Sequence, residues 1–239
     1  MHKTNQQVRI NKYLGECNVG SRRQIEQLLK EGKFSVNGIT AEVGQLINTE
    51  SDKVTLNGKL LTPIKKYMYI KLYKPKHVLS TAKDEHDRPT VLDYVKVAER
   101  LYPVGRLDYD STGLILLTND GELALKLTHP RYHLPKVYIV ETEETLDESQ
   151  LKKLQDGVTL GTTTTIPSIV KKLGANKFEI TLYQGMKRQI REMCAEVGLL
   201  VTAMHRTSIG PIKLGNLRPG ETAQLKDGEL AEILRLLAQ

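Results

Sequence analysis

A single carboxylate near the middle of the chain is the clearest candidate for a reactive group. Asp108 follows Arg106 by two residues and precedes a polar turn that ends at Gly113. The apolar run 114–117 comes next and is typical of a strand, and a loop attached to a rigid strand can hold one reactive group in place. Such a carboxylate could act as a nucleophile or stabilise a positive charge, and it could equally cap the turn without doing any chemistry.

The residues around Asp108 resemble a known family. The stretch from Gly105 to Asp108, followed after two residues by Ser111 to Leu114, is similar to the catalytic motif of the pseudouridine synthases. In that family the aspartate of this motif is the one essential catalytic residue. The resemblance therefore implies a catalytic role for Asp108.

Two later stretches resemble further motifs of the same family. Tyr138, within 136–138, matches a tyrosine that stacks on the target base, although the chain has ten tyrosines and an ordinary strand tyrosine is the alternative. Arg191, within 187–191, matches the basic residue that pairs with the catalytic aspartate. Arginine suits this task because it stays charged when buried, whereas desolvation alone raises the pKa of a carboxyl. Arg188 and Arg191 lie three residues apart on a predicted helix, so both could instead face solvent or RNA phosphates.

The implied reaction makes few demands beyond these groups. It breaks the bond between a uracil nitrogen and the sugar, turns the base and rejoins it through carbon 5, so nothing is consumed and we expect no cofactor. We also expect no metal: the loop 82–88 carries three acids and a histidine, but a hard cation needs converging oxygens rather than a flexible charged run. Arg106 would lie on the same side of an extended segment as Asp108 and could contact the displaced base or a phosphate.

Three other groups are set aside. Asp110 with Asp108 could imitate a glycosidase pair, but the two lie close together in the sequence and this reaction frees no alcohol. His205 with Arg206 could supply a general base, although a structural or phosphate-contacting pair fits better. Cys194 lies on an apolar helix face, where a thiol is inert.

Composition and charge limit the class of protein. With 239 residues, 39% of them hydrophobic and 26% charged, the chain suits one large globular domain or a large and a small one. A net charge of +7 favours a polyanionic partner, RNA or DNA first, and a basic surface without a partner is the alternative. Cys17 and Cys194 show no zinc or disulfide spacing, the N-terminus lacks the apolar core of a signal peptide, and no run reaches membrane-span length. We therefore expect a cytoplasmic protein.

Residues 1–61 are predicted to form a small RNA-binding module. The pattern indicates a helix from residue 10, a capping box at Ser21 and Gln24, and strands at 34–36 and 53–56 that are each followed by an Asn-Gly turn. The order of these pieces resembles the RNA-binding fold named after the fourth ribosomal protein of the small subunit. The basic residues expected to bind RNA there, unless they form an ordinary solvated face, are Arg22, Arg23, Lys12 and Lys33.

Residues 62–66 read as a linker because Pro63 blocks a helix, and residues 67–239 are expected to form the catalytic domain. The resemblance implies a mostly antiparallel central sheet there. The whole chain would then be an α+β protein in which a small N-terminal αL-type module precedes a larger pseudouridine-synthase domain. A short helix is predicted over 89–95, with Pro89 in its first turn. The remaining predicted strands are 67–73, 136–141, 166–172, 178–183 and 199–204. The remaining predicted helices are 121–127, 148–154, the segment around 190–197, and 229–237.

The expected partner follows from a last resemblance. Residues 204–211 are similar to the subgroup that acts on single sites of ribosomal RNA, and residues 184–194 are most similar to its large-subunit enzymes of type F. We expect a monomer. Its expected substrate is large-subunit ribosomal RNA in preference to small-subunit RNA, and transfer RNA is a further candidate. A non-catalytic RNA-binding factor for ribosome assembly, built on the same fold, is the alternative, and a base-removing glycosylase is a third hypothesis. The joint presence of Asp108, Tyr138 and Arg191 argues against the non-catalytic factor.

Overall fold

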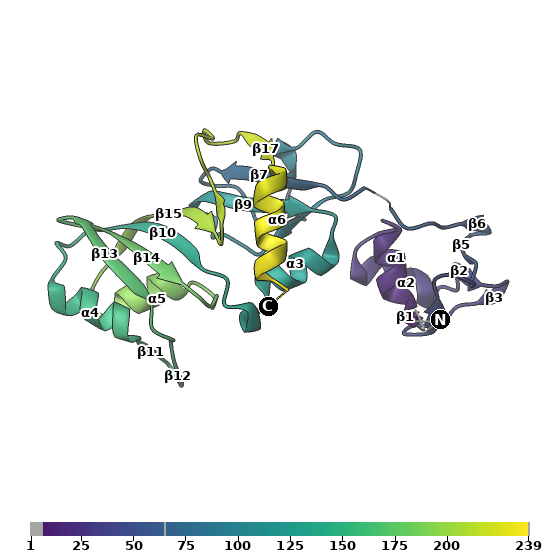
Figure 1. Ribbon diagram of the computed structural model, residues 1–239, viewed down its shortest axis with the longest axis horizontal. Helices are drawn as coiled ribbons and strands as arrows, with labels where there is room; N and C mark the ends of the chain where they lie inside the picture. The colour runs from purple at the N-terminus through teal and green to yellow at the C-terminus, as the bar shows by residue number, and fades with distance from the viewer. Residues whose placement is uncertain (1–6, 65, 239) are drawn as a thin grey trace. The chain divides into compact units, whose positions relative to one another are not determined.

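The computed structural model describes residues 7–64 and 66–238, and within these the chain divides into two compact units (Figure 1). The smaller unit runs to Tyr67 and takes in Ala98–Arg100 and Asn119–Gly121. The larger unit comprises Met68–Val97, Leu101–Thr118 and the segment that begins at Glu122. Each unit has a hydrophobic core of its own.

The smaller unit pairs two helices with short strands. Its elements are α1 Ile10–Glu16, α2 Arg22–Lys30, β1 Gln7–Arg9, β2 Phe34–Val36, β3 Ile39–Thr40, β4 Leu46–Asn48, β5 Val54–Leu56 and β6 Lys59–Leu60. Four of the strands form a sheet in the order β3-β2-β5-β6, and β1 pairs with β4. The capping box at the start of α2 is present, because the Gln24 amide donates to Ser21 Oγ and the Ser21 amide donates to Gln24 Oε1. The β2–β3 turn has positive φ at both Asn37 and Gly38, as a two-residue hairpin requires.

The larger unit is built on one extended sheet. Its strands are β7 Tyr69–Lys74, β8 Tyr102–Val104, β9 Thr112–Thr118, β10 Lys136–Thr142, β13 Ile169–Gly174, β14 Lys177–Leu182, β15 Val201–Ile209, β16 Ile212–Lys213 and β17 Thr222–Gln224. They run in the order β13-β14-β10-β15-β9-β7-β17, with β16 beside β15 and β8 beside β9. Among the strand pairs described within residues 66–238, only β9 with β15 is parallel. The expected mostly antiparallel sheet is therefore confirmed. A separate hairpin joins β11 Thr159–Leu160 to β12 Thr163–Thr164.

Helices cover different parts of this sheet. They are α3 Gly121–Thr128, α4 Glu148–Asp156, α5 Gln189–Glu196 and α6 Asp227–Leu236. Tyr138 and Met204, which face the same way on neighbouring strands, pack with apolar side chains of α4 and α5. Leu114 and Ile209 pack instead with α3 and α6 in a second cluster. A third cluster lies on β7 and β9 around Leu72, so the sheet carries three hydrophobic clusters within residues 66–238.

The short helix near residue 90 differs from the sequence prediction. A 3-10 helix, η1, spans Val91–Tyr94, and Thr90 is its extended N-cap at φ −116° and ψ 164°. Pro89 therefore lies before the helix and not in its first turn. The physical reason is the capping contact: the Thr90 amide donates to Asp93 Oδ2 at 2.7 Å, which makes Thr90 the N-cap and starts the helix at Val91, two residues after the proline. A second 3-10 helix, η2, spans Pro130–Tyr132.

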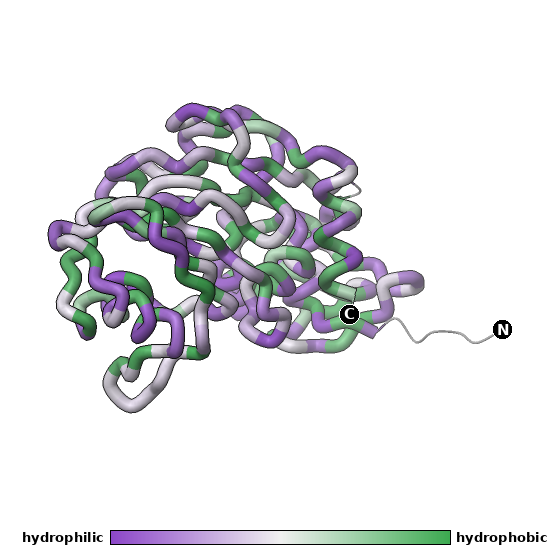
Figure 2. The backbone as a smooth tube through the Cα atoms, turned by 60° about the vertical axis from the view of Figure 1, so that its left-hand side comes forward, coloured by the Kyte–Doolittle hydropathy of each residue, from purple (hydrophilic) through white to green (hydrophobic). Residues whose placement is uncertain are grey.

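Figure 2 shows hydrophilic and hydrophobic residues interspersed along the backbone. Among the described helices, none is both long enough and apolar enough to span a membrane.

Candidate active site

Asp108 lies in a loop between β8 and β9 that is fastened on both sides of the carboxylate. Before it, Ser80 Oγ accepts from the Leu107 amide at 3.0 Å and donates to the Leu107 carbonyl at 2.8 Å. After it, the Ser111 amide donates to the Asp108 carbonyl at 3.1 Å and closes a tight turn. The side chain of Asp108 is 27% exposed. The backbone thus fixes the carboxylate while its oxygens stay accessible.

A buried lysine at the end of β7 supports the same turn. Lys74 is fully buried, and its ammonium donates to the Ser111 carbonyl at 2.7 Å and, at the longer distance of 3.4 Å, to the Tyr109 carbonyl. Burial lowers the pKa of Lys74 to about 8, and the nearby carboxylates of Asp110 and Asp108 counter part of that effect. The loop therefore rests on a cation that is itself costly to bury.

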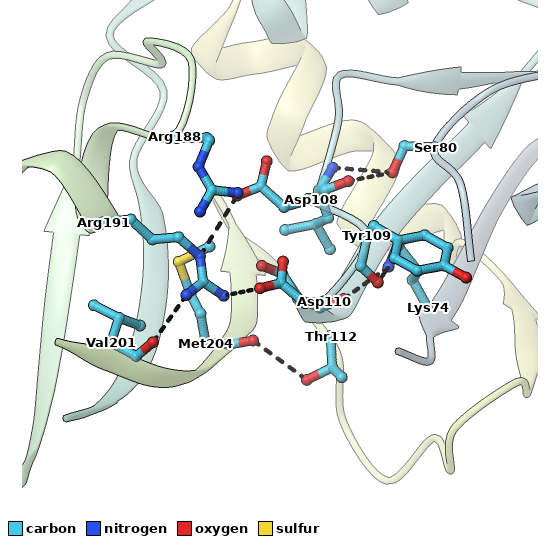
Figure 3. A network of polar contacts seen from close by, with 12 residues as sticks. Lys74, Ser80, Asp108, Tyr109, Asp110, Thr112, Arg188, Arg191, Val201 and Met204 are labelled. Atoms are coloured by element: carbon cyan, nitrogen blue, oxygen red, sulfur yellow. Dashed lines mark hydrogen bonds and ion pairs between the residues drawn. The ribbon is translucent and has the colours of Figure 1, made fainter. Parts of the chain in front are cut away.

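Two arginines at the start of α5 approach the Asp108 carboxylate, as Figure 3 shows. Arg188 Nη1 lies 3.8 Å and Arg191 Nε lies 3.9 Å from Asp108 Oδ2. Both distances are too long for hydrogen bonds, so Asp108 interacts with both cations through space and is locked to neither. Arg188 is the N-cap of α5 at φ 53°, a left-handed conformation that is uncommon for a side-chain-bearing residue and often occurs at functional sites.

The closest carboxylate to Arg191 is Asp110. Arg191 Nη2 lies 2.7 Å from Asp110 Oδ2, and Arg191 Nη1 donates to the Val201 carbonyl at 2.9 Å. The remaining nitrogen, Nε, is buried and has no hydrogen-bond partner. The guanidinium is thus held at two nitrogens, and its third points at Asp108 without bonding it.

A tyrosine and a second buried arginine contact each other on the neighbouring strands β10 and β15. Tyr138 on β10 is 9% exposed and belongs to the same hydrophobic cluster as Leu107. Arg206 on β15 is 3% exposed; its Nε donates to the Leu114 carbonyl at 2.7 Å, and its Nη1 donates to the Tyr138 hydroxyl at 3.4 Å. Arg206 Nη2 is buried without a hydrogen-bond partner. An unpaired buried donor is costly, so its persistence beside Tyr138 suits a site that receives a polar ligand.

Gly113 allows the loop and β15 to meet. Its φ is +110°, and a Cβ at this position would lie 2.3 Å from the Arg206 carbonyl oxygen. A side chain is therefore excluded where β9 begins its parallel pairing with β15. The glycine in the motif has a direct steric reason.

The structure brings together part of the predicted set. Asp108, Arg188 and Arg191 converge. Tyr138 belongs to the same hydrophobic cluster as Leu107, the residue before Asp108. Arg106 is exposed. The other predicted residues belong to the smaller unit, where all are exposed and Lys12 forms an i,i+4 pair with Glu16 at 3.9 Å. These are Arg22, Arg23, Lys12 and Lys33.

The structure also places the groups for which the sequence predicted no catalytic or metal-binding role. His205 Nδ1 lies 2.9 Å from Thr112 Oγ1, and strand alternation puts His205 on the sheet face opposite Arg206 and Tyr138. His205 lines a hollow of about 340 Å³ on that face, and burial lowers the pKa of its imidazole. In the charged loop 82–88, Asp84 pairs with Arg88 at 2.8 Å. Across the described residues, no three metal-ligating side chains gather in one place.

Sequence reasoning misses three side chains around the Asp108 loop. Asp110 was dismissed as a poor glycosidase partner, although a second acid two residues after Asp108 is visible in the sequence. Lys74 lies just past the predicted strand 67–73 and has no role assigned from the sequence, and Arg206 enters only as the neighbour of His205. A lysine or arginine inside a run that reads as a buried strand is the signal that could have found the last two.

Comparison with known proteins agrees with this site. A family description, RNA pseudouridylate synthase, matches residues 68–196, which is more than half of the chain and includes the Asp108 loop and α5. An uncharacterised RNA pseudouridine synthase of Aquifex aeolicus is 41% identical over 96% of this chain and 94% of its own length. The ribosomal large subunit pseudouridine synthase B of Bacillus subtilis is 38% identical over 96% of both chains.

Two further comparisons extend the likeness. The dual-specificity RNA pseudouridine synthase RluF of Escherichia coli K12 is 36% identical over 96% of this chain and 79% of its own. A crystal structure of a pseudouridylate synthase superposes with a TM-score of 0.70 at 28% identity, and it covers 96% of this chain and 99% of the other. The fold and the loop define an enzyme of RNA base isomerisation.

The chain belongs to the RNA pseudouridylate synthase family. The resemblance inferred from the motifs is confirmed, and so is the class of enzyme, an isomerase.

Proposed function

We propose that this enzyme converts one uridine of large-subunit ribosomal RNA to pseudouridine and that Asp108 is its catalytic carboxylate. The observation that carries the proposal is the position of Asp108, whose Oδ2 lies within 4 Å of two guanidinium groups without a hydrogen bond to either. The names of relatives that act on the ribosomal large subunit support the choice of RNA. Transfer RNA is the second substrate to test.

The electrostatics suit the reaction. Breaking the glycosidic bond leaves positive charge on the sugar, and an ionised Asp108 would attack or stabilise that centre. Arg188 and Arg191 place two positive charges within 4 Å of the carboxylate. Because neither arginine bonds Asp108 directly, both carboxylate oxygens remain available to the substrate.

The target uracil needs a binding contact in the enzyme once it has left the base stack of the RNA. Unstacking costs a few kcal/mol, and contact with an aromatic ring returns part of that cost. Tyr138 is our candidate for this contact, with Arg206 fixing its hydroxyl. Exposed Arg106, in the same loop as Asp108, would contact the displaced base or a phosphate.

The RNA-binding role of the smaller unit is part of the proposal. Arg22 and Arg23 open α2, where the helix dipole also favours anions, and no ion pair of theirs is described in residues 7–64. A tethered RNA-binding module raises the effective concentration of substrate at the catalytic unit. One copy of the chain supplies Asp108, Arg188 and Arg191 by itself, so we propose a monomer that works in the cytoplasm.

The decisive experiment replaces the carboxylate. We expect Asp108→Asn to lower the single-turnover rate on large-subunit ribosomal RNA by about a thousandfold or more while the affinity for RNA stays within about twofold. The assay is tritium release from RNA carrying 5-tritiated uridine, with a parallel arm on transfer RNA. Asp156→Asn, at an exposed carboxylate at the end of α4, is the matched control.

Three results would contradict the proposal in different ways. Pseudouridine formation by Asp108→Asn would remove Asp108 from the mechanism. Release of free uracil by the wild-type enzyme would indicate a glycosylase. RNA binding without any product, on every RNA tested, would indicate a non-catalytic factor.

The salt dependence of RNA affinity tests the proposed role of the smaller unit. The double variant Arg22→Ala, Arg23→Ala should lower the slope of log affinity against log salt by about 2, since each phosphate contact contributes about 0.9. The rate at saturating RNA should not change. Lys59→Ala, at an exposed residue of the same unit, serves as the control. An unchanged slope in the double variant would remove Arg22 and Arg23 from the RNA-binding surface.

A further inference from the structure

Asp110 has no role in the reaction described above, yet it makes the shortest ion pair in the site. Its Oδ2 lies 2.7 Å from Arg191 Nη2, whereas Asp108 Oδ2 lies 3.9 Å from Arg191 Nε. The Arg191 side chain is 13% exposed and that of Asp110 is 46% exposed. The shortest ion pair of the nearly buried Arg191 is therefore with Asp110 and not with the proposed catalytic group, Asp108.

The bonding pattern of Arg191 explains what this contact does. The planar guanidinium presents its donors in a fixed fork, so fixing two nitrogens fixes the third. Val201 takes Nη1 through its carbonyl and Asp110 takes Nη2. Nε is left buried, unbonded and directed at Asp108 (Figure 3).

We propose that Asp110 is a positioning residue that keeps Arg191 from closing onto Asp108. With Nη2 bound, the arginine supplies charge to Asp108 from a distance and leaves both oxygens of that carboxylate free for the sugar. Without Asp110, Nη2 loses its partner, and the guanidinium can turn about the Val201 contact to form a direct hydrogen bond with Asp108. That bond would occupy an oxygen that the reaction needs.

The geometry of the loop supports separate roles for Asp108 and Asp110. Asp110 follows Asp108 in the turn closed by the Ser111 amide, and Lys74 holds the same turn through the Ser111 carbonyl. The two carboxylates therefore move as one body, and the offset between them is set by the backbone. This inference rests on the proposed catalytic role of Asp108.

Two substitutions separate positioning from charge and from folding. Asp110→Ala removes the acceptor, and Asp110→Asn keeps an amide oxygen that can still accept from Arg191 Nη2. We expect Asp110→Ala to lower the single-turnover rate at saturating RNA by about 30- to 100-fold, because small misplacements of catalytic groups have effects of that size. We expect Asp110→Asn to retain the rate within about fivefold. Both should bind RNA within about twofold of the wild type.

If Asp110 had only a structural role, its substitution would lower the thermal midpoint of unfolding. Because Asp110 is half-exposed and the freed Arg191 nitrogen gains the Asp108 contact in its place, the thermal midpoint of both variants should match that of Asp156→Asn within a few degrees. Wild-type activity of Asp110→Ala would overturn the inference. Equal losses in Asp110→Ala and Asp110→Asn would also overturn it, as would a loss of RNA affinity without a change in rate.

The same measurements on Asp108→Asn keep the two proposals apart. If Asp108→Asn is inactive while Asp110→Ala is fully active, only the role of Asp110 fails. If Asp108→Asn is active, the proposed function itself fails.

Discussion

Lys74 gives the site a pH dependence that can be worked out from the structure. In the folded protein burial lowers the pKa of Lys74 to about 8, whereas an ordinary lysine in the unfolded chain has a pKa of 10.5. Between these values the unfolded chain holds a proton that the folded protein has lost, so the free energy of unfolding rises with pH. Below pH 8 both states are protonated and the cost of burying the charge is present in full. The difference corresponds to about 3 kcal/mol, at about 1.36 kcal/mol per pH unit.

The perturbation is Lys74→Met, which keeps an unbranched side chain but cannot titrate. Urea unfolding followed by circular dichroism, at intervals from about pH 7 to about pH 10.5, gives the free energy of unfolding of both proteins. The wild-type value should rise relative to the variant by about 3 kcal/mol across this range. Comparison of the two proteins cancels unfolding of the smaller unit, which both share.

The two cysteine thiols contribute a pH dependence of stability that has the opposite sign to that of Lys74. Burial raises the pKa of Cys17 to about 11 and that of Cys194 to about 12. Each folded thiol keeps its proton while the unfolded one loses it near pH 9, so each lowers stability as pH rises above 9, in the wild type and the variant alike. A flat difference between wild type and Lys74→Met from pH 7 to 10.5 would refute the reasoning about Lys74.

Three substitutions test other contacts. Gly113→Ala should destabilise the protein by at least about 3 kcal/mol in a urea melt, because the added Cβ would meet the Arg206 carbonyl, and a near-wild-type melt would contradict the close approach. Ser80→Ala should cost about 1–3 kcal/mol by the same measurement and slow the single-turnover rate, because both hydrogen bonds to Leu107 are lost; an unchanged rate would show that the loop is held without them. Ser21→Ala should cost about 1 kcal/mol, seen as faster hydrogen exchange confined to α2, and unchanged exchange would show that the capping box contributes nothing.

Local features of the fold were predictable because their causes are local. Ser21 and Gln24 cap α2 within three residues, and the positive φ at Asn37 and Gly38 follows from the turn alone. The pairing of β1 with β4 was not predicted, since each strand is three residues long and the register depends on contacts about forty residues apart. Periodicity carries no information about such pairs.

The site shows the same division. The motif around Asp108 was readable, and α5 was correctly expected to carry Arg191. What the sequence could not supply was the geometry that gives Asp110, and not Asp108, the shortest contact with Arg191. That contact depends on how α5 meets the Asp108 loop, which is a tertiary property. Arg206 was missed because burial of an arginine depends on the strands around it.

The parallel pairing of β9 with β15 has a consequence for how the enzyme comes into being. It joins Thr112 to His205, 93 residues later, so the ring of chain that it closes cannot form until nearly all of the polypeptide has been synthesised. A product that stops short of residue 201 contains the whole Asp108 loop but lacks the strand against which Gly113 packs. Such a truncated chain keeps the smaller unit but cannot form the β9–β15 pairing beside the Asp108 loop, so the site around Asp108 is completed only late in synthesis.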